Sequence, residues 1–369
     1  MQDAEHVGII RSDSGNLPHI LSRMTSHKNR MAAVMHTGIG RGHRGNPAAS
    51  LIIQQLYGIP VLLSGIGSLV LKKSEIDLID NHQKLTVENP MKLHAGSLPW
   101  TIHLRILSNF GMIARMPKGI LHQQALEYFS SHKPSSRSWF SQVRDICLLY
   151  QLPHPLVIMK SEQSKDSLKT QVKRAVLIYW EKKLRIEASE LPSLKYFHPQ
   201  LMTLSSPHQL WISASASSYE VSKATIQARM LYGRYRTELL CSHWSSNQNG
   251  WCLTPACLGN EAKEDLDHIL AFCPSLDHTR GNLHHFTMSF AKLNTVLYPI
   301  LSTYCNPRHP LFSQFILDCT CLPDIHAITN LYGHTLLNKL LYIGRTWCYS
   351  LHRDRARLSI DGPLNDFIA

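Results

Sequence analysis

Apolar residues recur along most of the chain at the three- and four-residue spacing of helices that bury one face. Leu104 and Leu107 share one side of such a helix with Gly111, and the segment from Trp139 to Tyr150 repeats the spacing. Further helices are predicted over residues 164–188, 280–302 and 324–353, and a Ser-rich linker is predicted over residues 205–218. The pattern therefore predicts a mainly α fold.

The predicted helix that begins near Trp139 has candidate signals at both ends. Ser136 and Ser138 are both candidate N-caps, and the segment Leu152–Pro155 would end the helix because proline disfavours helical backbone before it. Trp139 and Tyr150 could form a platform for stacking, but aromatic residues at this spacing more often pack in a core.

The longest apolar stretch runs from Leu51 to Leu71, close to the ~20 residues that cross a membrane. It is interrupted by glutamines, serines, glycines and a proline. Two buried helices joined at Tyr57–Pro60 explain the stretch better than a membrane span. The acids near the N-terminus, Asp3 and Glu5, do not fit a signal peptide, so we expect an intracellular protein, nuclear or cytoplasmic.

Composition narrows the function classes. The 369 residues are 44% hydrophobic and 17% charged, which excludes a disordered polyelectrolyte and allows two or three domains. The formal net charge of +12 favours a polyanionic partner, above all nucleic acid. Nine cysteines, an odd number spread along a long chain, do not resemble a secreted disulfide framework.

Three basic regions are candidate phosphate contacts. Residues 14–74 contain no acid, and their glycine-rich segment carries Arg41 and Arg44. The second region is the row Lys165, Lys169 and Lys173 on a second edge of the predicted helix 164–188. The apolar edge of that helix is predicted to be Leu168, Val172, Ala175 and Tyr179. The alternative for each region is an ordinary basic protein surface without a partner.

The third basic region mixes arginines with tyrosines. Arg229, Arg234 and Arg236 could clamp phosphates, while Tyr232 and Tyr235 between them could stack on bases. The alternative is a surface helix whose tyrosines pack on the core. A further basic and aromatic segment lies near the C-terminal end: Trp347, Tyr349, His352, Arg353, Arg355 and Arg357.

The strongest chemical motif is a set of three cysteines and one histidine within 22 residues. Cys252, Cys257, His268 and Cys273 offer the thiolate and imidazole ligands that tetrahedral zinc prefers. Four protein ligands leave no open position, so the expected cofactor is a structural zinc ion. The alternative is a set of buried free cysteines beside a surface histidine.

The first ligand of this motif has nearby competitors. The spacing of four residues between Cys252 and Cys257 is wider than the usual two, and Cys241 and His243 lie just upstream. Either residue could replace Cys252. Residues 264–267 are rich in acids and are predicted to open a short helix that carries His268, with the acids at its positive end.

These cysteines and the segment "DHIL" at 267–270 resemble the C-terminal zinc knuckle of non-LTR (LINE-type) retrotransposon reverse transcriptases. Other segments resemble the same family in the same order, particularly its chicken-repeat-like elements. They are "HVGIIRS" at 6–12, "RGHRGNPAASL" at 41–51, "YGIPVLLSGIGSLVL" at 57–71, "SWFSQVRDICLLYQLPHPL" at 138–156, "RMLYGRYRTE" at 229–238 and "TWCYSLHRDR" at 346–355.

The resemblance implies a truncated reverse transcriptase without its catalytic centre, because no Asp-Asp dipeptide is present to hold two divalent metals. In that family the thumb grips the template–primer duplex and the knuckle region binds RNA and target DNA. The chain would then divide into five regions. These are 1–72 (post-palm and thumb entry), 73–156 (helical thumb-like domain), 157–220 (basic helix and linker), 221–280 (basic patch and zinc knuckle) and 281–369 (helical C-terminal region).

Three functions follow from these expectations. The first is nucleic-acid binding without catalysis, directed at RNA, an RNA–DNA duplex or target DNA, with no membrane partner or small-molecule substrate. The second is the C-terminal segment of an active RNA-directed DNA polymerase whose palm lies upstream. The third is a relic, or a zinc module that contacts proteins.

Overall fold

The computed structural model describes residues 4–6, 9–12, 15–36, 52–91, 99–131, 138–201, 204, 207–214, 217–244 and 249–358. These residues are mainly helical, which confirms the predicted fold class. The chain divides into two compact units, Met1–Leu184 and Arg185–Ala369, each described here by itself. The finer division into five regions stays a prediction. No helix in the described ranges is long and apolar enough to cross a membrane.

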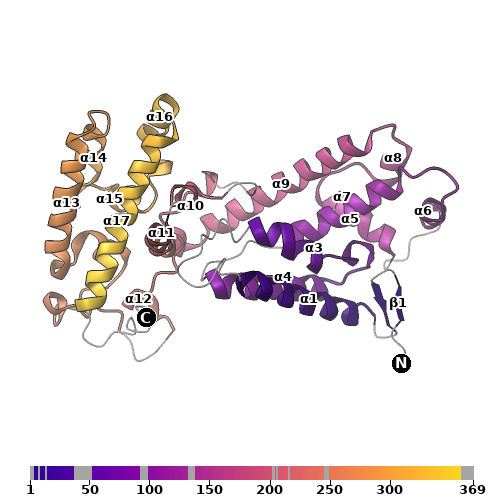
Figure 1. Ribbon diagram of the computed structural model, residues 1–369, viewed down its shortest axis with the longest axis horizontal. Coiled ribbons are helices and arrows are strands. Elements are labelled where there is room, and N and C mark those ends of the chain that lie inside the picture. Colours follow the sequence, from indigo (N-terminus) through magenta and orange to yellow (C-terminus); the bar gives the residue numbers. More distant parts are fainter. Residues whose placement is uncertain are drawn as a thin grey trace. The chain divides into compact units, whose positions relative to one another are not determined.

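The first unit combines helices with a small antiparallel pair of strands, β1 (Ala4–His6) and β2 (Ile9–Arg11) (Figure 1). Within this unit α1 packs on α3 and α4, while α5 packs on η3 and α7. Its helices are α1 (Leu17–His36), η2 (Gln54–Gly58), α3 (Ile59–Leu62), η3 (Ile66–Ser68), α4 (Lys73–Met91), α5 (Pro99–Ile113), α6 (Leu121–Ser131), α7 (Trp139–Leu149), α8 (Pro155–Lys160) and α9 (Lys165–Ser189), whose last residues belong to the second unit.

The predicted helix near Trp139 is α7, and its cap is Ser138, whose side chain accepts a hydrogen bond from the Ser141 N–H. Ser136 lies outside the described residues. Tyr150 is buried, and its hydroxyl accepts a hydrogen bond of 2.8 Å from the Trp180 indole. Tyr150 therefore belongs to the core, as the more ordinary interpretation predicts, while Trp139 is half-buried beside Phe110.

The apolar stretch 51–71 differs from the expectation of two helices joined at Tyr57–Pro60. Residues 54–62 are helical without a break, because η2 is a π-turn that leads directly into α3. Pro60 lies in the first turn of α3, where a missing N–H costs least. The two helical pieces thus meet at Gly58 and Ile59, inside the expected junction, but no break separates them. The segment is buried at Leu62 and Leu63, whereas Leu56 and Tyr57 are exposed.

The second unit is organised around α17 (His334–Leu358), which packs against α10, α11, α13, α15 and α16 (Figure 1). The other elements of the unit, in chain order, are η4 (Pro192–Leu194), η5 (Pro199–Leu201), α10 (Gln209–Ser213), α11 (Ser218–Leu231), α12 (Glu238–Ser242), η6 (Pro255–Cys257), η7 (His268–Phe272), η8 (Pro274–Leu276), α13 (Asp277–Lys292), α14 (Tyr298–Tyr304), α15 (Phe312–Leu317), η9 (Cys319–Cys321) and α16 (Pro323–Tyr332).

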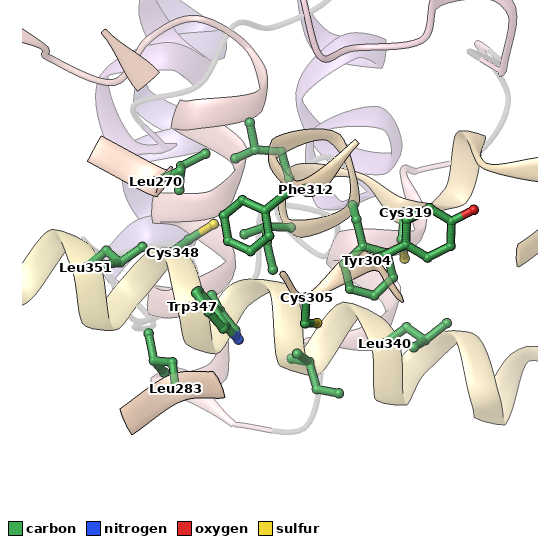
Figure 2. Close-up of a cluster of buried hydrophobic side chains, with 14 of the residues drawn as sticks. Leu270, Leu283, Tyr304, Cys305, Phe312, Cys319, Leu340, Trp347, Cys348 and Leu351 are labelled. Carbon is green, nitrogen blue, oxygen red and sulfur yellow. The ribbon is translucent and has the colours of Figure 1, made fainter. Parts of the chain in front are cut away.

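Trp347 on α17 lies at the centre of the core of this unit (Figure 2). Its side chain is fully buried, its ring meets that of Phe312 edge-on at 5.3 Å, and its indole donates a hydrogen bond to the Thr287 hydroxyl. Leu270, which lies between two of the predicted zinc ligands, belongs to the same core. The cysteine motif is thus part of the second unit's core and not a separate appendage.

Two predicted helices of this region are each divided in the structure. The segment 280–302 is split because Asn294 accepts hydrogen bonds from the N–H groups of Val296 and Leu297, which competes with helical pairing. The segment 324–353 is split because Gly333 takes a φ of 73° between α16 and α17. The predicted linker 205–218 contains α10, which buries Leu210 and Trp211.

Candidate metal centre

The four predicted ligands lie together in the structure. The sulfur and imidazole nitrogen atoms of Cys252, Cys257, His268 and Cys273 all lie within 4.8 Å of one another. The Cys273 Sγ is 3.9 Å from that of Cys252 and 3.8 Å from that of Cys257, and the His268 Nε2 is 3.4 Å from the Cys257 Sγ. The three cysteines are buried, and His268 is half-buried.

These separations match the edges of a tetrahedron around zinc. Zn–S bonds of ~2.3 Å place two tetrahedral sulfurs about 3.8 Å apart, and a Zn–N bond of ~2.0 Å places nitrogen about 3.5 Å from sulfur. The donor set and these three separations are therefore compatible with a zinc site. Among the described residues no other group of three or more Cys, His, Asp or Glu side chains has this arrangement.

The first two ligands are positioned by a tight turn. The Cys252 N–H bonds to the Ala262 carbonyl, and Trp251 pairs with Lys263, so the chain runs back alongside itself. Within the turn, the Thr254 carbonyl accepts from the N–H groups of Cys257 and Leu258. This turn brings Cys252 and Cys257 to the same side despite their unusual spacing.

The other two ligands are positioned by the π-helix η7. The Asp265 carboxylate accepts a hydrogen bond of 2.7 Å from the His268 N–H, which places an acid at the positive end of the helix as the sequence predicts. The Cys273 N–H bonds to the His268 carbonyl five residues earlier. The wider π-turn sets the imidazole of His268 and the thiol of Cys273 toward the same point.

Arg280 closes the opposite end of η7, a role that the sequence did not reveal. Its buried guanidinium donates to the carbonyl oxygens of Ile269 and Cys273 and pairs with Asp277 at 2.6 Å. A cation at a helix C-terminus is stabilised by the exposed carbonyls. Arg280 therefore fixes the backbone that carries the last ligand.

The three thiols differ in acidity because they share protons at short range. Hydrogen bonding with Cys252 lowers the pKa of the Cys273 thiol, and the same contact raises the pKa of Cys252. Burial raises the pKa of Cys257. One thiolate is thus already favoured at neutral pH, while the other two sulfurs lose their protons when a metal binds.

The structure also decides between the competing first ligands. It brings Cys252 into the group, whereas Cys241 is buried on α12 and His243 is exposed at the end of that helix. Neither alternative residue belongs to the metal-ligand group found among the described residues.

The predicted phosphate contacts lie in different parts of the chain. Lys165, Lys169 and Lys173 are exposed along α9, whose buried edge is formed by Leu168, Val172, Val176 and Trp180 in place of the predicted Ala175 and Tyr179. Arg41 and Arg44 lie outside the described residues. The structure thus confirms that the lysine row faces solvent, and whether it binds phosphates stays a prediction.

The Arg229–Arg236 segment differs from the expected mixed surface. Arg234 and Arg236 are exposed, Arg229 is half-buried, and burial lowers the pKa of its guanidinium. The Tyr235 ring is buried against His352 and Arg355, and the Tyr232 ring packs on Phe197. Tyr235 is therefore a core residue and is not available to stack on bases.

The predicted basic C-terminal segment is likewise divided. Arg353 and Arg357 are exposed, whereas Trp347 and Arg355 are buried. Arg355 forms an ion pair with Glu264. In the sequence, Glu264 lies between the metal-ligand candidates Cys257 and His268. Sequence reasoning missed this pair, since neither residue belongs to a local motif.

Comparison of the chain with protein-family models, with curated proteins and with solved structures finds no match. The similarity to retrotransposon reverse transcriptases therefore rests on the quoted segments alone.

Proposed function

We propose that the protein is a non-catalytic nucleic-acid-binding protein whose second unit is held together by a structural zinc ion. The observation that carries the nucleic-acid part is the exposed lysine row of α9. Lys165, Lys169 and Lys173 lie on the exposed side of a helix that is anchored by Leu168 and Val172. Among the described residues, no salt bridge engages any of the three lysines.

The spacing of these lysines suits a phosphate backbone. Residues four apart on a helix rise by ~6 Å, so the row extends over about 12 Å. A strand of duplex carries one phosphate per ~3.4 Å of axis, so the row covers about three phosphates. Arg174 and Lys182 on the same helix are also exposed and add positive charge. The formal net charge of the protein, +12, is opposite in sign to the charge of a phosphate backbone.

The zinc part rests on the closed donor set. Four protein ligands leave no coordination position for water or substrate, so the ion would stabilise the fold and would supply no chemistry. The protein's own residues supply no paired aspartates of a polymerase centre either, because the chain contains no Asp-Asp dipeptide. The segments that resemble non-LTR reverse transcriptases support a thumb-like role for the first unit.

The test is the salt dependence of binding to a fluorescent RNA–DNA duplex, measured by anisotropy. We expect log K to fall linearly with log salt, because each phosphate contact releases counterions. Changing Lys165, Lys169 and Lys173 together to Ala should weaken binding equally for unrelated sequences. The slope should fall by about one for each lysine that binds a phosphate in the wild type.

A matched control removes the same charge from another place. Lys263, Lys292 and Lys339 are exposed on the second unit, and the triple change to Ala lowers the net charge equally. The proposal predicts that this control retains most of the affinity. Equal losses in both variants would show only general charge attraction, and a wild-type slope of zero would contradict nucleic-acid binding.

A second candidate function is protein binding by the knuckle, defined here as residues 249–279. Its sequence is not basic, since five carboxylates (Glu261, Glu264, Asp265, Asp267 and Asp277) stand against Lys263 and the adjacent Arg280, and Glu264 is buried. Leu258, which follows Cys257, is 55% exposed, and Phe272, which precedes Cys273, is 63% exposed. The sulfur atoms of these two cysteines lie 3.8 Å apart. Exposed apolar side chains close together on a surface favour a protein contact. Absence of duplex binding by a correctly folded wild-type protein would favour this candidate.

A further inference from the structure

We infer that Thr254 is the positioning residue of the metal centre, a hydroxyl that stabilises the zinc-bound thiolates. Its hydroxyl oxygen lies 3.1 Å from the Cys252 Sγ and 3.3 Å from the Cys273 Sγ. The residue is completely buried. The inference rests on the zinc ion of the proposed function and adds a residue that is not a ligand.

The chemistry of the donor set creates a need for such a group. Three thiolates around a divalent cation leave one net negative charge in a buried site, and burying a charge is costly unless hydrogen bonds compensate it. A metal-bound thiolate only accepts hydrogen bonds, so the Thr254 hydroxyl must donate, and its single proton serves the Cys252 and Cys273 sulfurs in turn. Charge-assisted hydrogen bonds of this kind are stronger than neutral ones.

Thr254 also holds the ligands through its backbone. Its carbonyl accepts hydrogen bonds of 2.9 Å from the Cys257 N–H and 3.2 Å from the Leu258 N–H. One residue thereby touches three of the four ligands: two through the hydroxyl and one through the carbonyl. A change of side chain removes the hydroxyl and keeps the carbonyl, so a substitution separates the two roles.

The experiment measures the rate at which zinc passes from the full-length protein to an excess of a chromophoric chelator. Thr254→Val replaces the hydroxyl by a methyl group of similar size, and Thr254→Ser restores the hydroxyl. Outer groups that orient metal ligands typically change metal affinity by ~10- to 100-fold. We expect Thr254→Val to lower zinc affinity by that factor and to release zinc faster, with Thr254→Ser close to wild type.

A merely structural hydroxyl would not produce this pattern. Thr287 is equally buried, and its hydroxyl donates to the Leu283 carbonyl and accepts from the Trp347 indole. Thr287→Val therefore loses a buried hydroxyl without touching the metal centre, and we expect its zinc release to match wild type. Thr254→Ala is the second variant if the valine side chain disturbs the fold.

The possible results are distinct. Zinc release from Thr254→Val or Thr254→Ala at the wild-type rate would overturn the role of Thr254. Equal acceleration in Thr287→Val would also overturn it, by showing that general destabilisation releases the metal. A wild-type protein that binds no zinc would instead remove the metal centre itself. A shift of the thiolate-to-metal absorption band of the Co²⁺-loaded Thr254→Val protein, absent in Thr287→Val, would support a direct contact with sulfur.

Discussion

Arg355 and Glu264 form a buried bidentate ion pair, although 91 residues separate them in the chain. The Arg355 Nε donates to one carboxylate oxygen of Glu264 at 3.0 Å, and its Nη2 donates to the other. The same carboxylate accepts from the Glu238 N–H at 2.9 Å. Both side chains of the pair are 1% exposed. The pair therefore fastens the knuckle to α17, the central helix of the second unit.

Breaking this pair should destabilise the second unit strongly. Arg355→Met would leave the Glu264 carboxylate buried without its cation, which costs about 3–5 kcal/mol. The matched control is Arg357→Met on the same helix, where an exposed guanidinium lies 3.8 Å from Asp354. Exposed pairs of this kind contribute about 0–1 kcal/mol.

The two variants are compared by urea unfolding of the full-length protein, followed by circular dichroism. A midpoint shift in Arg355→Met that does not exceed the shift in Arg357→Met would mean that the pair does not hold the knuckle in place.

Two glycines should respond in opposite directions to alanine. Gly333 has φ 73° and ψ −177°, a region that is essentially confined to glycine, so Gly333→Ala should cost about 1–3 kcal/mol. Gly281 lies inside α13 with space for a Cβ, so Gly281→Ala should stabilise the protein by about 0.5–1 kcal/mol. A Cβ at Gly333 would also meet no atom within 4 Å, which leaves backbone conformation as the only difference.

Thermal unfolding of both variants and the wild type measures the two effects. A Gly333→Ala variant as stable as the wild type would contradict the backbone described between α16 and α17, and a destabilised Gly281→Ala variant would contradict the space for a Cβ in α13.

Zinc affinity should rise with pH. The pKa values of the Cys252 and Cys257 thiols are raised, so both carry protons at pH 7 and must lose them on binding. The pKa of Cys273 is lowered, so its thiolate is present beforehand and releases no proton. We therefore expect log K for zinc to increase by about two per pH unit around neutrality.

Calorimetry in buffers of different ionisation enthalpy counts the released protons directly. Release of no protons at pH 7 would contradict the assigned thiol states.

The protein should not extend a primer on an RNA or DNA template with Mg²⁺ or Mn²⁺. Phosphoryl transfer by two metals needs carboxylates that hold both ions, and the chain has no Asp-Asp dipeptide. A gel assay with a purified polymerase as positive control measures this. Extension by the protein that survives repeated purification would overturn the non-catalytic proposal.

The sequence predicted those features that depend on residues close together in the chain. The helices α7 and α9 follow from apolar periodicity, and the metal ligands follow from cysteine and histidine spacing within 22 residues. The two divided helices were missed, although Asn294 and Gly333 carry the signals that end them. The spacing of apolar residues continues across Asn294 and Gly333, so the pattern predicted one helix where the structure has two.

Long-range pairs could not be predicted from the same information. Arg355 has exposed arginines on both sides in the sequence, and only the packing of α17 shows that it faces Glu264. Tyr235 likewise belongs to a segment rich in arginine, yet its hydroxyl lies 3.0 Å from the Nδ1 of His352 in the core. Thr254 was missed because its role depends on two sulfurs that meet only in the folded chain.

The metal content of the full-length protein tests the central claim most directly. We predict one zinc ion per chain by elemental analysis and native mass spectrometry, lost in Cys273→Ser and retained in Cys241→Ser, a change at a buried cysteine outside the ligand group. A zinc content near zero in the wild type, or unchanged zinc in Cys273→Ser, would contradict the account.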